Sequence, residues 1–357
     1  MMTKIDYDVD SLVGELLSKD GFFIDLIGCE QFTFWYLLRQ IGIRSYAPII
    51  GTTSFIFKSS KSSLQEIINS RKQNIFTLFA NASRYFNTNI IYYNNSYKNY
   101  QAFIKEAILK GRFVYALYDT SFDSLKPFDL DYSDWHGYAL VGFDDEKKEY
   151  RSIFSTSVKY EDLENMLQRA YIREGSYKNV LYYIDSVERT TTNQIQTIIK
   201  KDLLEDLKKD LEHWKIEFQF FLEEIEDIRK SEFLDIEEQC DFIAKRNNFY
   251  NMLMVGGYGN FVFKIRCFQE LYGIDVRNLE EKFSQNRKES LVIANMFRKA
   301  LIKIERNNQE YYANLVPAIC DKINSIYIKE GKALYESFCD IVCPLLKERS
   351  YIYESLE

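Results

Sequence analysis

Two residues, Cys29 and His136, could supply a nucleophile and an acid–base group to a reaction. Cys29 follows Ile27-Gly28 and opens a run with helical periodicity, whereas His136 opens an apolar, strand-like run much later in the chain. The chain has only two histidines, His136 and His213. A thiol at a helix start and an imidazole on a distant strand are the minimal parts of a cysteine nucleophile pair. This pairing is the chemical hypothesis that the other residues must support.

The position of Cys29 favours a reactive thiol. At a helix N-terminus the unpaired N–H groups and the helix dipole stabilise a thiolate, which lowers a thiol pKa that is ordinarily about 8.5. The backbone N–H of Cys29 could also point at a developing oxyanion. The polar residues Glu30 and Gln31 follow it, so the first turn is not wholly apolar. The alternative is that Cys29 is a small buried core residue.

The six cysteines are too sparse for a disulfide scaffold, and no histidine accompanies the close pair Cys339 and Cys343. We therefore expect no metal site and no protein-bound cofactor.

His136, preceded by Trp135, lies where a general base or acid could act. The alternative is a structural histidine bonded to a neighbouring carbonyl. His213 falls in the polar part of a long helical run and is expected to be solvated. Acidic residues cluster before the histidine strand and could attract a cationic amine, or simply form a solvated loop: Asp119, Asp129, Asp131 and Asp134.

The elements that must position these residues differ between the two halves of the chain. The first half mixes helix and strand signals, with Gly42 as a helix stop. Helices are expected at 30–41, 64–78, 97–109 and 160–170, and strands at 113–118, 138–143, 150–154 and 180–184. The charged run 144–149 reads as a hairpin turn, which makes the strands on either side antiparallel neighbours.

After a polar break at 188–193, the hydrophobic period becomes that of a helix and stays so. Thr192 or Asn193 could cap a long helix whose apolar stripe runs from Leu204 to Ile228. Further helices are expected at 236–253, 261–272, 278–283, 290–307, 310–328 and 332–347. The sequence predicts two domains, residues 1–188 and an all-helical domain at 189–357.

Composition narrows the class of protein. The 357 residues carry a net charge of -7, which argues against a nucleic-acid binder. No signal peptide is visible at the start, and no apolar run reaches the ~20 residues that span a bilayer. We therefore expect a cytoplasmic protein with no membrane partner.

The histidine strand and the cysteine helix together resemble bacterial papain-fold proteins. These include the C39-like peptidases and the family of the N-terminal domain of butirosin biosynthesis protein H. The resemblance covers roughly residues 20 to 185 and rests on Gly28-Cys29-Glu30 with the helix to Gly42, on His136-Gly137-Tyr138-Ala139-Leu140-Val141-Gly142-Phe143-Asp144-Asp145, and on Val158-Lys159-Tyr160-Glu161-Asp162-Leu163.

The resemblance implies an α+β, papain-like cysteine-peptidase domain followed by a helical domain. In the butirosin-type proteins the cysteine–histidine pair takes an acyl group from a carrier-protein thioester and passes it to an amine, forming an amide in antibiotic biosynthesis. The implied partners are an acyl or peptidyl carrier protein, whose phosphopantetheine arm bears the acyl group, and a small amine.

Two family residues are missing at their usual places. The strand after the histidine strand carries no Asp or Asn, and counting around the hairpin puts Ser155 or Thr156 opposite His136. Phe23 stands where the family's oxyanion Gln is expected, so Gln31 or the backbone alone could supply that role.

From these residues we predict a cysteine-dependent acyltransferase. Cys29, His136 and Ser155 are the expected catalytic residues, and Gln31, Asp119, Asp134 and Trp135 the expected substrate-binding residues. Two alternatives stay open: a cysteine peptidase or thioesterase of the same fold, and a binding protein built on a decayed papain fold.

Overall fold

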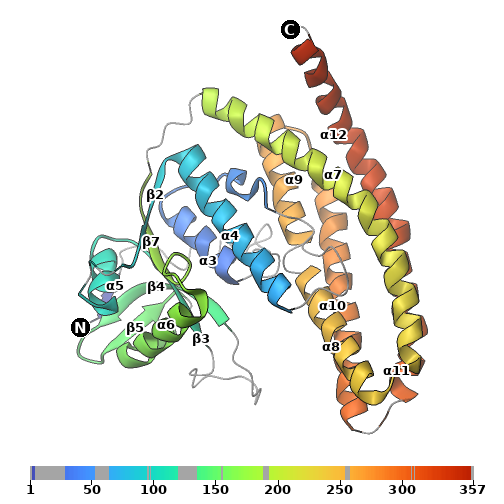
Figure 1. Cartoon of the computed structure of the whole chain (residues 1–357). Helices are drawn as coiled ribbons and strands as arrows, with labels where there is room; N and C mark the ends of the chain where they lie inside the picture. Colours follow the sequence, from blue (N-terminus) through green and yellow to red (C-terminus); the bar gives the residue numbers. More distant parts are fainter. Residues whose placement is uncertain are drawn as a thin grey trace. The chain divides into compact units, whose positions relative to one another are not determined.

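A computed structural model describes residues 2–4, 29–52, 64–94, 96, 98–119, 135–153, 156–187, 193–253, 258–306, 308 and 310–354. Over these residues the chain is α+β and mostly helical, with antiparallel strands gathered in its first half (Figure 1). Contacts divide the chain into a sheet unit, Met1–Ser45 with Phe79–Thr191, and a helical unit, Tyr46–Leu78 with Thr192–Glu357.

The short segment after residue 45 groups with the helical unit, although the sequence analysis placed it in the first domain. The backbone N–H of Tyr46 donates to Glu270 (2.9 Å), and that of Gly51 donates to Asp206 (2.7 Å). These carboxylates belong to helices of the helical unit, so the segment is fixed there by charge-assisted hydrogen bonds.

The sheet unit is built on one antiparallel sheet. Its described strands are β1 (Met2–Lys4), β2 (Thr88–Tyr92), β3 (Val114–Asp119), β4 (Trp135–Asp144), β5 (Glu149–Ser152), β6 (Ser157–Lys159) and β7 (Leu181–Val187). The order is β2-β7-β3-β4-β5-β6, and β1 pairs with the far end of β4. The predicted hairpin between β4 and β5 is confirmed, with Lys148 at a positive φ of 54° in the turn.

Helices cover both faces of this sheet (Figure 1). On one face, α3 (Cys29–Gln40) packs against β4, β3 and β7. On the other face, α5 (Tyr100–Leu109) packs against β4 and β3, and α6 (Tyr160–Glu174) packs against β3 and β6. The neighbouring residues Tyr182 and Tyr183 of β7 show the alternation, because Tyr182 contacts Phe34 of α3 whereas Tyr183 contacts Phe103 of α5.

Helix α3 ends as the sequence predicts. Gly42 has a φ of 86°, and its N–H donates to the carbonyl of Arg39 while the N–H of Ile43 donates to that of Leu38. This is the Schellman arrangement, which favours glycine at the left-handed position. The side chains from Phe32 to Leu38 are all buried, so α3 is a core helix rather than a surface one.

Helix α4 (Leu64–Phe86) is longer than the predicted 64–78, and the boundary between the two units falls within it. It ends where Asn87 adopts a φ of 49°. The short strands β1, β2 and β6 were not predicted, because so few residues carry little periodic signal.

The helical unit confirms the change of period after residue 188. Its helices are α7 (Asn193–Lys230), α8 (Ile236–Met252), α9 (Tyr258–Tyr272), α10 (Arg277–Glu305), α11 (Glu310–Ile323) and α12 (Gly331–Glu354). Within the unit, α10 packs against α8, α9, α11 and α12, and α7 packs against α9, α11 and α12.

Two predicted helix breaks are absent. Residues 278–283 and 290–307 lie in the single helix α10, whose buried positions continue through the supposed gap at Asn286 and Arg287. A π-helical segment, Asn324–Glu330, joins α11 to α12, and Gly331 keeps right-handed helical angles. A side chain at Gly331 would approach the carbonyl oxygen of Ile326 to 3.3 Å, so this glycine serves close packing instead of ending a helix.

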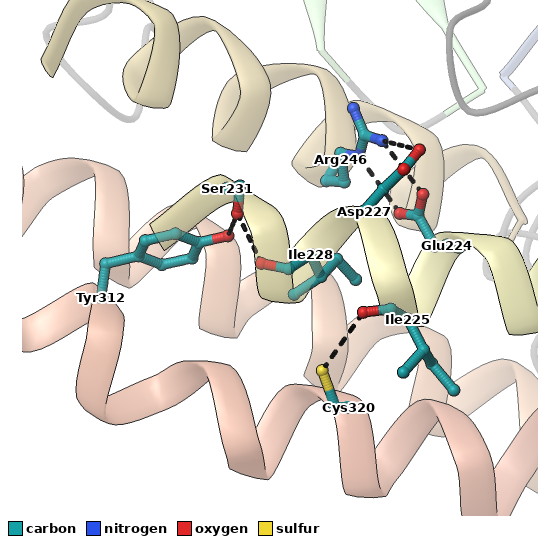
Figure 2. A network of polar contacts seen from close by, with 8 residues as sticks. All are labelled: Glu224, Ile225, Asp227, Ile228, Ser231, Arg246, Tyr312 and Cys320. Carbon is teal, nitrogen blue, oxygen red and sulfur yellow. Dashed lines mark hydrogen bonds and ion pairs between the residues drawn. The ribbon is translucent and has the colours of Figure 1, made fainter. Parts of the chain in front are cut away.

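Buried polar contacts tie the helices of this unit together (Figure 2). Arg246 of α8 donates two hydrogen bonds to the buried carboxylate of Glu224 on α7, at 3.2 and 3.1 Å. The Oη of Tyr312 and the Oγ of Ser231 share a hydrogen bond of 2.6 Å, and Ser231 also donates to the carbonyl of Ile228. In the part of the chain that the structure describes, no helix is long and apolar enough to cross a membrane.

Candidate functional site

A buried hydrogen bond joins the second turn of α3 to the start of β4. The Oγ1 of Thr33 donates to the carbonyl oxygen of Gly137 at 2.9 Å. Cys29 stands four residues before Thr33, which in a helix is one turn away on the same side, and His136 directly precedes Gly137. The contact therefore brings the two predicted catalytic positions to the same end of the sheet.

Among the described residues, the Gly137 carbonyl points to a side of β4 that has no strand partner at this level. The carbonyl of Ala139 accepts a hydrogen bond from the N–H of Ile153, on the side of β5. Carbonyl groups two residues apart in a strand point to the same side, so the Gly137 carbonyl points to the side of β5 as well. Strand β5 ends at Ser152, opposite Leu140. Over the described residues, no strand pairs with β4 on this side at Gly137, and Thr33 fills the place of a strand donor.

The side chains of β4 decide how closely α3 can approach. Gly137 and Ala139 face the side that α3 covers, and both are small. A Cβ at Gly137 would lie 2.6 Å from the Cε2 atom of Tyr115. Strict alternation along a regular strand gives His136 the face of the sheet opposite the one that α3 covers. His136 itself is half-buried.

Strand β3 brings another predicted residue to this end of the sheet. Its register with β4 pairs Tyr118 with His136 and Asp119 with Trp135. The backbone therefore places Asp119, Trp135 and His136 next to one another. They lie at the end of β3 and the start of β4, close to the Gly137 carbonyl that accepts the hydrogen bond from Thr33. Asp134, Asp129 and Asp131 lie outside the described residues, so their expected role stays a prediction.

A row of tyrosines supports the sheet below α3. Tyr115, Tyr182 and Tyr92 are cross-strand partners on β3, β7 and β2, and the rings of Tyr115 and Tyr182 stack at 4.6 Å. Burial raises the pKa of Tyr182 well above its ordinary value, and the Glu30 carboxylate adds to the shift. Glu30 is one turn before Phe34, which contacts Tyr182, so the first turn of α3 carries a negative charge above this row.

The structure locates the predicted oxyanion donor on α3. Gln31 is 6% exposed and two positions after Cys29. Residues two apart on a helix do not face each other, so the helix geometry does not favour a shared site for these two side chains. The backbone N–H groups at the start of α3 are the alternative donors named from the sequence.

The third catalytic position stays open. Ser155 lies outside the described residues. Its neighbour Thr156 shares a hydrogen bond of 2.6 Å with the Oγ of Ser152, and its carbonyl accepts from the N–H of Ser152. Thr156 therefore lies beside Ser152, which pairs with Leu140, and not opposite His136 as the hairpin count predicted.

Sequence reasoning missed Thr33, Tyr115 and Gly137 as parts of this site. Thr33 carried a usable signal, because it is a polar residue within the apolar run from Phe32 to Leu38. Tyr115 and Gly137 gave none, since their contact exists only once β3 and β4 are paired. His213, the other histidine, lies on α7 in the helical unit.

No group of three or more His, Cys, Asp or Glu residues that could hold a metal ion is found among the described residues. No protein-family model matches the chain, and no curated protein matches it significantly.

Proposed function

We propose that this protein is a papain-like, cysteine-dependent acyltransferase that moves an acyl group from a carrier-protein thioester to an amine. The observation that carries the proposal is the Thr33–Gly137 hydrogen bond, which brings the turn of Cys29 to the strand of His136. A helix that begins at Cys29 and packs on an antiparallel sheet, against a strand whose second residue is His136, supports this proposal.

The first half-reaction forms an acyl-enzyme. His136 takes the proton of the Cys29 thiol, and the thiolate attacks the thioester carbonyl to form a carbon–sulfur bond and an oxyanion. Backbone N–H groups at the start of α3 would stabilise this oxyanion. Its collapse breaks the bond to the carrier's sulfur, which leaves as a thiolate and takes the proton from the imidazolium.

The second half-reaction makes the amide. The amine nitrogen attacks the acyl-enzyme carbonyl while His136 removes the proton that the nitrogen loses. Collapse of the second oxyanion releases the Cys29 sulfur, which recovers that proton from the imidazolium. Exchange between two thioesters is nearly isoenergetic, so the first step needs less transition-state stabilisation than amide cleavage does.

Charge near the site suits an amine as acceptor. Glu30 adds a carboxylate to the first turn of α3, and Asp119 ends β3 beside the start of β4. Negative groups raise the local concentration of a cationic amine. Together with the net charge of -7, this favours a small cationic acceptor in a cytoplasmic biosynthetic reaction over an anionic one.

Intact-mass spectrometry tests the proposal. Incubation with an acyl N-acetylcysteamine thioester, a mimic of the phosphopantetheine arm, should add one acyl group to the wild-type chain. The adduct should be absent from Cys29→Ala and present in the matched control Cys240→Ala, whose thiol lies on α8 of the helical unit. An adduct that persists in Cys29→Ala would exclude Cys29 as the nucleophile.

The fate of the adduct separates the alternatives. Addition of small primary amines should convert it to an amide faster than water hydrolyses it. Hydrolysis alone would indicate a thioesterase, and cleavage of a peptide panel a peptidase. No adduct, together with Cys29 labelling no faster than a free thiol, would indicate a decayed, binding-only fold.

A further inference from the structure

We infer that Thr33 is a positioning residue that sets the distance between Cys29 and His136. The inference rests on the proposed function, because it concerns the same pair of residues. It deepens that function by assigning a positioning task to the Thr33 side chain. The task is to fix the start of β4 against the N-terminal half of α3.

The Thr33 hydroxyl donates its hydrogen bond outside its own helix. Three hydroxyl groups in other helices donate back to the carbonyl four residues earlier: Thr197 to Asn193, Ser290 to Asn286 and Ser337 to Ala333. This is the usual local choice for serine and threonine within helices. For Thr33 the equivalent acceptor is the carbonyl of Cys29 itself. Thr33 donates instead to a strand residue 104 positions away.

The acceptor of this hydrogen bond is the backbone carbonyl of Gly137 on β4. The Gly137 carbonyl points to the side where, over the described residues, β4 has no strand partner at this level. A buried carbonyl without a partner costs about 1–3 kcal/mol, so a donor is needed at this point. Because the donor comes from α3, the helix that carries Cys29 holds β4 on this side, whereas β3 pairs with it on the other side.

Gly137 is tightly packed on the face of the sheet that α3 covers. Gly137 has no side chain, and Tyr115 occupies the space that one would fill. Thr33 is 2% exposed, and Tyr115 is 1% exposed. The contact is therefore buried on both sides. A packed contact of this kind allows little displacement of the His136 backbone, and displacements of about 1 Å in a catalytic group can cost about 10²-fold in rate.

The test compares three substitutions by iodoacetamide labelling of Cys29 across pH, followed by peptide mass spectrometry. Thr33→Val removes the donor and keeps the shape, and Thr33→Ser keeps the donor. Thr52→Val is the matched control, because Thr52 is equally buried and its Oγ1 also donates to a carbonyl, that of Ile49 in the helical unit (2.7 Å). Thermal unfolding is measured on all of them.

We expect Thr33→Val to slow Cys29 labelling near neutral pH by about tenfold and to move the profile toward that of a free thiol. Thr33→Ser should keep the wild-type profile. Thr52→Val should lose stability without any change in labelling. If Thr33→Val does not fold, Thr33→Ala compared with Thr33→Ser isolates the hydroxyl in the same way.

The labelling experiment has three possible results, and each has a different consequence for the role of Thr33. A wild-type labelling profile in Thr33→Val, with lower stability alone, would make Thr33 purely structural and overturn the inference while the proposed function stands. A shifted profile rescued by serine would support it, even if no acyl adduct forms with any thioester. Wild-type Cys29 that labels like a free thiol would overturn both, since there would be no pair to position.

Discussion

The phenol ring of Tyr115 lies where a side chain at residue 137 would have to be. A Cβ on Gly137 would be 2.6 Å from Cε2 and 2.8 Å from Oη of that ring. Tyr115 is in turn held by its stacking on Tyr182, so it has little freedom to move away. The strand that carries His136 is therefore held in place by Tyr115 of the neighbouring strand β3 and by Thr33 of α3.

Gly137→Ala tests this packing. The added methyl group should lower the free energy of unfolding by about 1–3 kcal/mol, the usual cost of overpacking. Tyr115→Leu removes the ring that the methyl would meet, so the double variant Gly137→Ala/Tyr115→Leu should be more stable than the sum of the two single effects predicts. Chemical denaturation of the four proteins gives this coupling energy. Simple additivity would mean that the two residues do not constrain each other.

His136→Gln should slow formation of the acyl-enzyme by at least ~10²-fold, because a positioned acid–base group contributes that much. His213→Gln is the matched control, since it removes the other histidine of the chain from α7 in the helical unit, and it should leave the rate unchanged. Stopped-flow release of the leaving thiol measures both variants. Equal losses in the two would show that the site has been assigned to the wrong histidine.

Glu30→Gln should speed alkylation of Cys29 near neutral pH, by about tenfold or less. A carboxylate beside the thiol disfavours the thiolate, because like charges repel, and its removal lets the helix start act alone. The same change removes a favourable interaction with the helix dipole, about 0.3–1 kcal/mol, so the variant should be slightly less stable and yet more reactive.

The control for that variant is Glu161→Gln, which neutralises an exposed carboxylate in the first turn of α6. It should change neither the labelling rate nor its pH dependence. Slower labelling of Cys29 in Glu30→Gln would indicate that Glu30 assists the thiolate instead of opposing it.

Lys264→Met should destabilise the helical unit by about 3–5 kcal/mol, because it leaves buried carboxylates without a counter-charge. Lys264 is fully buried and bonds Asp206 at 2.9 Å and Asp210 at 2.8 Å. The matched control Lys245→Met breaks an exposed ion pair with Asp241 and should cost less than about 1 kcal/mol. Equal midpoints of urea unfolding for the two variants would contradict this assignment.

The pH dependence of the Lys264 contribution has a definite sign. Burial alone would lower the pKa of Lys264, but attraction by Asp210 and Asp206 raises it above the ordinary 10.5. The stabilisation is thus fully present below pH 10.5 and is lost as the pH rises through the raised pKa. The stability difference between wild type and Lys264→Met should therefore be constant between about pH 6 and 9 and shrink only in strong alkali.

Local pattern was enough to predict most elements of this chain. The apolar spacing in α3, the Gly42 stop and the charged turn between β4 and β5 are each encoded within a few residues, and all three are confirmed. Local signals failed where packing overrides propensity. The sequence predicted a break between residues 328 and 332, but the helix continues through Gly331, where a side chain would lie only 3.3 Å from the carbonyl oxygen of Ile326.

The candidate site shows the same division. Residue type and local context singled out Cys29 and His136, since a thiol at a helix start and a histidine at a strand start are both local features. Only the tertiary structure placed α3 on β4, paired Asp119 with Trp135 and revealed Thr33 as the link between helix and strand. Such contacts join residues far apart in the chain, and their energies depend on the shapes of both surfaces. A one-dimensional pattern of polarity and propensity does not record those shapes.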